Sequence, residues 1–229
     1  MLDCHTHVLP GLDDGAPDID AGLALCRRLH ELGVDQVVAT PHWCSPRFAV
    51  EDEGIARAWS SLTTRVAAEV PGLRLVLGSE HHCSGLQDPS AFVASLHPFT
   101  GSRCVLIELP DDHLPASTWP SLFAVSRAGF RAILAHPERC KGLAAGSDGL
   151  AAFTDAGGLL QLTLGHLIGT HGFAMRWRSR RLLARYPRSC IIASDSHDLN
   201  IRRPRWDQLP GKWRHLVPAD LAALERWGG

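Results

Sequence analysis

The segment Asp3-Cys4-His5-Thr6-His7 runs into Val8-Leu9-Pro10-Gly11-Leu12-Asp13-Asp14-Gly15, and the rest of the chain is expected to assemble around it. In an extended strand alternate side chains share a face, so His5 and His7 are expected to point the same way. The loop that follows is rich in Gly and Asp and can bring Asp13 or Asp14 back over the strand end. Two imidazoles beside a carboxylate are a typical arrangement of metal ligands.

Six further apolar runs have the composition of buried strands, and segments with a helical pattern separate them. The predicted strands after the first are 35–42, 74–82, 104–108, 131–139, 159–165 and 190–197. The predicted helices are 17–32, 51–70, 90–96, 117–128, 149–156, 173–186 and 218–227. Strands that alternate with helices are typical of parallel βα units, and nearly continuous apolar strands are typical of a sheet covered on both faces.

Six of these seven strands end in residues that can bind a metal. In a parallel βα barrel the carboxyl ends of all strands lie on one face, where such folds carry their functional sites. Residues scattered over the whole chain are therefore expected to meet at this face. The candidate ligands at the strand ends are His5, His7, His42, Glu80, Glu108, His136, Asp195 and His197.

Imidazole and carboxylate ligands without a thiolate fit Zn, Mn or Fe(II), and the share of carboxylates favours Mn or Fe over Zn. The ligands exceed what one ion needs, so we expect two or three divalent ions bridged by at least one carboxylate. Such a site suits in-line displacement at phosphorus. Arg139 lies three residues after His136 and can bind a phosphate beside the metals, and the loop residues Arg47, Arg202 and Arg203 can do the same.

Size and composition favour one domain over residues 1–229, because 229 residues with 45% apolar content can bury a full core. Lys and Arg (23) nearly balance Asp and Glu (24), so no net charge favours nucleic acid. No signal sequence or spanning apolar run is recognisable, so we expect no membrane insertion and a cytoplasmic location. The seven cysteines form no Cys-x-x-Cys pair and are expected to be reduced thiols, with Cys4, Cys104 and Cys190 buried.

Six motifs carry a resemblance to a known family. They are Asp-x-His-x-His-x-Leu-Pro-Gly-x-Asp-Asp-Gly at 3–15, Ala-Thr-Pro-His at 39–42, Gly-Ser-Glu-His-His at 78–82, Leu-Ile-Glu at 106–108, Ala-His-Pro-Glu-Arg at 135–139 and Ser-Asp-Ser-His at 194–197. The set resembles the polymerase-and-histidinol-phosphatase (PHP) superfamily. It is most similar to the bacterial manganese-dependent protein tyrosine phosphatases of capsule and exopolysaccharide gene clusters. This resemblance implies a distorted, TIM-like (β/α)7 barrel with three metal ions, manganese favoured.

Carried over residue by residue, the resemblance assigns the metal ligands to three groups. One ion is held by His5, His7, Glu80 and Asp195, a second by Glu80, Glu108 and His136, and a third by Asp14, His42 and His197, so that Glu80 is the bridge and a catalytic residue. Arg139, with Arg202 or Arg203, is implied to hold the phosphate. The implied substrate is phosphotyrosine on a bacterial tyrosine autokinase that controls polysaccharide export. His166 departs from the family pattern, which usually has a small residue there.

Two alternatives stay open at this point. A phosphatase of the same superfamily could act on a small metabolite such as histidinol phosphate, and a noncatalytic regulatory module could use the metals for stability alone. A cysteine-dependent phosphatase is excluded, because no cysteine has an arginine six positions later. The native metal, the general acid and the oligomeric state are not fixed by the sequence.

Overall fold

The computed structural model describes residues 1–85 and 88–228, and all of its paired strand segments are parallel. The strand segments are β1 (Leu2–Thr6), β2 (Gln36–Ala39), β3 (His42–Trp43), β4 (Arg74–Leu77), β5 (Glu80–His82), β6 (Cys104–Glu108), β7 (Arg131–Ala135), β8 (Leu159–Thr163) and β9 (Cys190–Ala193).

The segments form a closed ring with a seam between the first and the last strand. One sheet has the order β1-β2-β4, and a second has the order β3-β5-β6-β7-β8-β9. Since β3 follows β2 and β5 follows β4 after only two residues each, the chain makes seven passes around the ring. A parallel bridge between Thr6 and Ser196 closes the seam. The expectation of a distorted (β/α)7 barrel is thereby confirmed.

Two predicted strands are interrupted, one at a proline and the other at a glycine packed against a distant ring. The predicted strand 35–42 breaks at Thr40-Pro41, because proline lacks the N–H that a ladder requires. The predicted strand 74–82 breaks at Gly78-Ser79, where a Cβ on Gly78 would overlap with the ring of buried Phe99. The predicted strand 159–165 ends earlier than expected, at Thr163.

Apolar side chains form two layers, one inside the barrel and one between the strands and the helices. On β6, Leu106 belongs to the inner layer, whereas Val105 and Ile107 belong to the outer layer, as the alternation of a strand requires. The inner layer also includes Leu221 and Leu224 of the last helix. These apolar residues fill the barrel interior, and the polar residues gather at the carboxyl ends of the strands.

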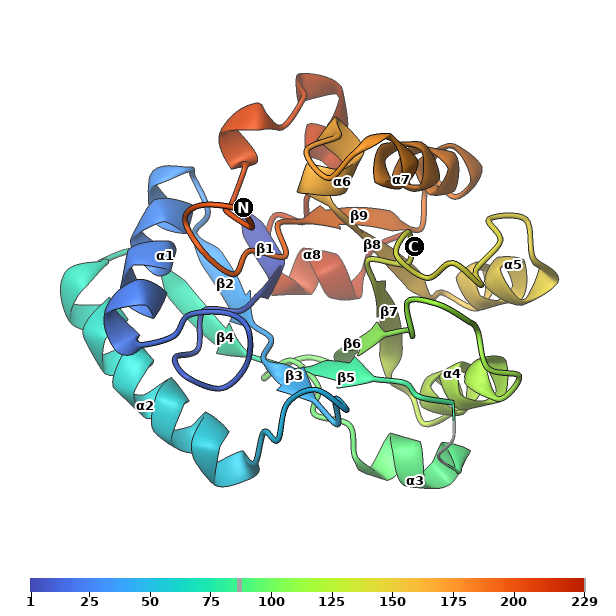
Figure 1. Cartoon of the computed structure of the whole chain (residues 1–229), viewed down its shortest axis with the longest axis horizontal. Helices are drawn as coiled ribbons and strands as arrows, with labels where there is room; N and C mark the ends of the chain where they lie inside the picture. Colours follow the sequence, from blue (N-terminus) through green and yellow to red (C-terminus); the bar gives the residue numbers. More distant parts are fainter. Residues whose placement is uncertain (86–87, 229) are drawn as a thin grey trace.

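The helices lie around the ring of strands, as Figure 1 shows for α1, α2, α4 and α5. Their bounds are α1 (Ile19–Glu31), α2 (Asp52–Glu69), α3 (Pro89–Ala94), α4 (Thr118–Arg127), α5 (Asp148–Asp155), α6 (Leu164–Ile168), α7 (Phe173–Arg185) and α8 (Leu221–Glu225), with 3-10 turns at Trp206–Gln208 and Gly211–Leu216.

All seven predicted helices are present, with ends shifted by at most three residues. The sequence analysis missed α6 and the two 3-10 turns, because segments of three to six residues are too short to show a helical period. Among the helices that the structure describes, none has the length and apolarity to cross a bilayer.

Candidate metal centre

The buried carboxylate of Glu80, on β5, lies among four imidazoles that come from three different strand ends, because His5 and His7 share the end of β1. Its Oε1 lies 2.8 Å from His136 Nε2 and 3.5 Å from His5 Nε2, and its Oε2 lies 3.1 Å from His42 Nδ1 and 3.5 Å from His7 Nε2. The Nε2 atoms of His5 and His7 are only 3.2 Å apart. The predicted bridging residue is therefore at the middle of the cluster.

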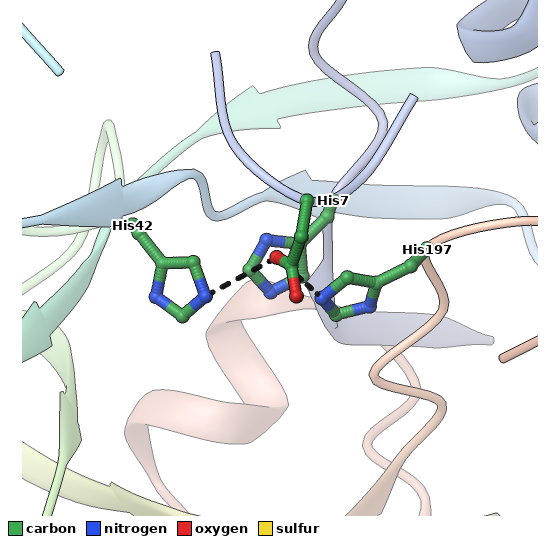
Figure 2. Close-up of side chains that lie close together, drawn as sticks. His7, His42 and His197 are labelled. Carbon is green, nitrogen blue, oxygen red and sulfur yellow. Dashed lines mark ion pairs between the residues drawn. The ribbon is translucent and has the colours of Figure 1, made fainter. Parts of the chain in front are cut away.

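Asp14 forms a second group of candidate ligands with the imidazoles of His7, His42 and His197. Its Oδ1 lies 3.4 Å from His42 Nε2 and 3.2 Å from His197 Nε2. The rings of His7 and His197 stack with their centroids 3.8 Å apart. Figure 2 shows the imidazoles of His7, His42 and His197 around a shared carboxylate, with the ion pairs to His42 and His197 dashed.

The two remaining acids complete the cluster from opposite sides of the barrel. Asp195 Oδ1 lies 3.5 Å from His5 Nε2, 3.7 Å from His7 Nε2 and 3.5 Å from His197 Nδ1. Glu108 reaches both His42 and His136 at 3.9 Å. The structure thus brings together all nine residues that the sequence analysis named as metal ligands: His5, His7, Asp14, His42, Glu80, Glu108, His136, Asp195 and His197.

Buried acceptors around the cluster orient its imidazoles. His7 Nδ1 donates to Asp13 Oδ2 over 2.8 Å, and His5 Nδ1 donates to Gln161 Oε1 over 2.8 Å, so that each Nε2 is left to face the centre. Between the two acids that the sequence left open, Asp13 is therefore the one that orients His7, and Asp14 is the one that enters the cluster. Gln161 lies on β8, the one predicted strand that does not end in a candidate metal ligand.

The backbone is strained at two of the strand ends that carry predicted ligands. His136 has φ 28° and Asp195 has φ 53°, in the left-handed region that residues with a side chain rarely adopt. The surrounding hydrogen bonds hold both residues, since His136 N donates to Gln161 Oε1 and Asp195 N donates to His5 O. Strain of this kind is concentrated at functional sites.

Two residues of the cluster, Asp195 and His197, have the protonation state that a metal ligand requires. Burial alone would raise the pKa of Asp195, but His5, His197 and Arg202 hold it well below the ordinary value. Burial, together with the neighbouring His7, lowers the pKa of His197 to about 4. Asp195 is thus ionised and His197 is neutral at pH 7, as metal ligands must be.

Without a bound cation, imidazoles at the centre of the cluster favour their protonated form, and several buried polar atoms lack a hydrogen-bond partner. Burial opposes protonation of His5, but Glu80 and Asp195 outweigh it and raise the pKa of His5. Among the described residues, neither oxygen of Glu80 and neither His42 Nδ1 nor His197 Nε2 has a suitably placed hydrogen-bond partner. Divalent cations would satisfy these atoms and balance four carboxylates, so the residues present fit the metals that the sequence predicts.

A cavity of about 340 Å³ lies beside the cluster and contains most of the predicted phosphate-binding arginines. Arg139, Arg202 and Arg203 line it, together with Asp195. Arg139 pairs with Asp111 at 3.1 Å, and Arg202 pairs with Asp14 at 2.8 Å and with Asp195 at 3.3 Å. Arg47 does not line this cavity; it is exposed and lies 3.6 Å from Asp111.

The cavity wall includes residues that the sequence analysis did not assign to the site. His166, the departure from the family pattern, lines the cavity and has its Nδ1 2.8 Å from the buried carboxylate of Glu138. Arg205 and His171 also line it. The sequence offered a signal for Arg205, since it lies ten residues after Asp195 in the same loop as Arg202 and Arg203. Its place in the cavity wall could not be predicted, because this depends on how the loop folds.

Comparison with known proteins shows which family the chain resembles. A family model described as "Capsular polysaccharide synthesis, CpsB/CapC" matches residues 1–211. The tyrosine-protein phosphatase YwqE of Bacillus subtilis is 28% identical over 202 residues, which are 88% of this chain and 79% of YwqE. The tyrosine-protein phosphatase CpsB of Streptococcus pneumoniae is 24% identical over 212 residues, 91% of this chain and 87% of CpsB.

Solved structures agree with these sequence matches. A chain from the crystal structures of B. subtilis YwqE and S. pneumoniae CpsB, described as metal-dependent tyrosine phosphatases, superposes with a TM-score of 0.79 at 27% identity, over 90% of this chain and 83% of that one. The organophosphorus hydrolase of Deinococcus radiodurans shares the fold alone, with a TM-score of 0.51 at 13% identity, over 100% of this chain and 92% of that one. From the match over residues 1–211 we conclude that this chain belongs to the CpsB/CapC family of capsular polysaccharide synthesis.

Proposed function

We propose that the chain hydrolyses phosphotyrosine in proteins with the help of two or three divalent metal ions. The observation that carries this proposal is the convergence of nine His, Asp and Glu side chains beside a cavity lined by Arg139 and Arg202. The names of the YwqE and CpsB relatives support the choice of phosphotyrosine among phosphate esters.

We assign the metals to the residues that the resemblance implies. His5, His7, Glu80 and Asp195 would hold one ion, Glu80, Glu108 and His136 a second, and Asp14, His42 and His197 a third. When bound, divalent ions lower the pKa of coordinated water and screen the charge on phosphoryl oxygens. Four carboxylates in the set support manganese or iron over zinc, with manganese favoured.

The chain's own residues would bind and orient the phosphate ester. Arg139 and Arg202 would donate hydrogen bonds to the phosphoryl oxygens, and their pairs with Asp111, Asp14 and Asp195 hold both guanidinium groups in position. Arg203 lines the same cavity and is the third candidate. The phenolate of tyrosine, with a pKa of about 10, needs less help from a general acid than an alkoxide does.

The biological setting belongs to the same proposal. A bacterial tyrosine autokinase of the capsule or exopolysaccharide system would be the protein substrate, and the whole chain would act as one cytoplasmic domain. The absence of disulfides supports a reducing compartment, since all seven cysteines are free and six of them are buried. The packing of Leu221 and Leu224 inside the barrel supports a single domain.

Two measurements on the purified protein test the proposal. Metal analysis should find at least two divalent ions per chain, and kcat/KM should be higher for a phosphotyrosine peptide than for histidinol phosphate. An equal or reversed preference would favour a small-metabolite phosphatase. A protein with its full metal complement that hydrolyses no aryl phosphate would instead be a regulatory module.

A further inference from the structure

One part of the cavity wall is built from a segment without any acidic residue. Residues 156–194 contain six arginines and no Asp or Glu, and they form β8, α6, α7 and β9. From this segment Thr163, Leu164, Gly165, His166, His171, Met175 and Ser194 line the cavity. This wall therefore offers no carboxylate to neutralise a cation in the cavity.

Two of the four arginines in the cavity already have acidic partners, and two do not. Arg139 pairs with Asp111, and Arg202 pairs with Asp14 and Asp195. Within residues 1–85 and 88–228, no carboxylate lies within 4.0 Å of the guanidinium of Arg203 or Arg205. The cavity thus contains more positive charge than one phosphate held by Arg139 and Arg202 would use.

Arg205 is the better placed of these two cations, because its loop is held on both sides. Arg205 is half-buried, whereas Arg203 is exposed. The neighbouring Trp206 is buried and donates from Nε1 to Asp3 Oδ2 over 2.9 Å. At the start of the loop, His197 N donates to Arg202 O over 2.9 Å. A cation fixed in this way loses little conformational entropy when it binds an anion.

None of the other residues that line the cavity beside Arg205 on its β8–α7 wall is acidic. His166 is held by the buried Glu138 and meets the ring of His171 edge-on, with centroids 4.9 Å apart. Burial, His166 and Arg205 all lower the pKa of His171, so this ring is neutral at pH 7. Met175 and Ile201 complete the lining.

We infer that this cavity binds an acidic side chain of the substrate polypeptide, close to its phosphotyrosine, with Arg205 as the partner of that carboxylate. The inference rests on the proposed function for the position of the phosphotyrosine. It adds a substrate class, which is a tyrosine site with Asp or Glu beside it. Arg205 is then a residue that determines specificity, distinct from the phosphate-binding Arg139 and Arg202.

Binding of non-hydrolysable peptides to the metal-loaded protein tests the inference without requiring turnover. Three peptides carry a difluorophosphonate analogue of phosphotyrosine, flanked by Glu, by Gln or by Lys, and fluorescence anisotropy gives their Kd values. We expect the Glu peptide to bind about three- to tenfold more tightly than the Gln peptide, and the Lys peptide to bind most weakly. The ratio of two Kd values on one preparation is independent of the fraction of folded protein.

Three variants test whether Arg205 causes the preference for the Glu peptide over the Gln peptide. In Arg205→Gln the Glu-to-Gln ratio should fall to within about twofold of unity, whereas Arg205→Lys should keep most of it because the charge remains. The matched control is Arg57→Gln, an exposed arginine on α2, which should keep the wild-type ratio.

The outcomes separate this inference from the proposed function. The inference would be overturned if the wild-type protein bound the Glu and Gln peptides with nearly equal Kd values, or if Arg205→Gln left the ratio of these values unchanged. Either result would hold even if phosphotyrosine is hydrolysed. A clear preference that depends on Arg205, in a protein that hydrolyses no aryl phosphate, would support the inference while the proposed function fails. Arg205-dependent sedimentation with phosphatidylglycerol vesicles and no peptide preference would overturn it in favour of a lipid surface.

Discussion

Glu80 is the residue on which the metal centre depends most, because its two oxygens face four imidazoles. In Glu80→Gln an amide of the same shape replaces the negative charge and places N–H donors among nitrogen lone pairs. We expect the loss of at least one bound ion per chain and a fall of about 100-fold or more in aryl phosphatase kcat.

Metal analysis and a phosphotyrosine assay measure both effects in Glu80→Gln. Glu51→Gln is the matched control, since Glu51 is exposed and makes no capping hydrogen bond at the start of α2. A Glu80→Gln protein with full metal content and full activity would contradict the assignment of the bridge.

His81, the neighbour of Glu80, gives the metal-free protein a defined acid sensitivity. Its Nε2 accepts a hydrogen bond of 2.8 Å from His97 N, and burial lowers its pKa to about 4 from the ordinary 6.5. Between these two values the unfolded state binds the proton more strongly, so the free energy of unfolding falls as the pH falls. This group accounts for at most about 3 kcal/mol, fully lost below pH 4.

Urea unfolding of the metal-free protein at pH 7 and pH 5 tests the role of His81. His81→Gln should lose less stability than the wild type between these values, because one group no longer takes up a proton on unfolding. His215→Gln, at an exposed histidine, should behave like the wild type. Identical losses in all three proteins would show that His81 does not titrate as its burial implies.

Among the elements, the loop between β1 and α1 has the narrowest tolerance for added side-chain atoms. A Cβ on Gly15 would overlap with the carbonyl oxygen and the Cβ of His7, and Ala16 N donates to the same carbonyl over 3.1 Å. In Gly15→Ala the loop must therefore move, and Asp14 moves with it. We expect the loss of about one ion per chain and at least about a tenfold fall in activity.

Gly146→Ala is the control for Gly15→Ala, because a Cβ on Gly146 meets no atom within 4 Å. Metal content and activity should stay at the wild-type level in this control. Wild-type metal binding in Gly15→Ala as well would mean that the loop can shift without displacing Asp14.

The elements also show which features the sequence could predict. The order of strands and the ligands at their ends followed from the sequence, because parallel strands place their carboxyl ends together whatever the details of packing. The breaks at Pro41 and Gly78 and the short helix α6 did not follow, since they depend on tertiary neighbours such as Phe99. Gln161, Asp111 and Arg205 were missed for the same reason: each acts through a partner brought close only by the fold.

At the scale of the whole molecule, the metals and the folded barrel should stabilise each other. The ligands come from strands all around the ring, so the unfolded chain cannot bind the ions in the same way. Ions at 1,000 times their Kd stabilise a fold by about 4 kcal/mol, which corresponds to roughly 10 °C in the melting temperature of a chain this size.

Differential scanning calorimetry with and without a chelator measures this stabilisation. We expect the chelated protein to melt roughly 10 °C lower, and re-addition of Mn²⁺ to restore the higher melting temperature. A melting temperature that does not respond to the chelator would show that the nine residues bind no ion tightly.

The seam of the barrel has a consequence for biosynthesis. His5 and His7 leave the ribosome some 190 residues before Asp195 and His197, which meet them across the Thr6–Ser196 bridge. While this stretch is being translated, the two histidines are therefore unprotected in the nascent chain, and loading with the ions in their final arrangement has to wait until Asp195 and His197 have emerged.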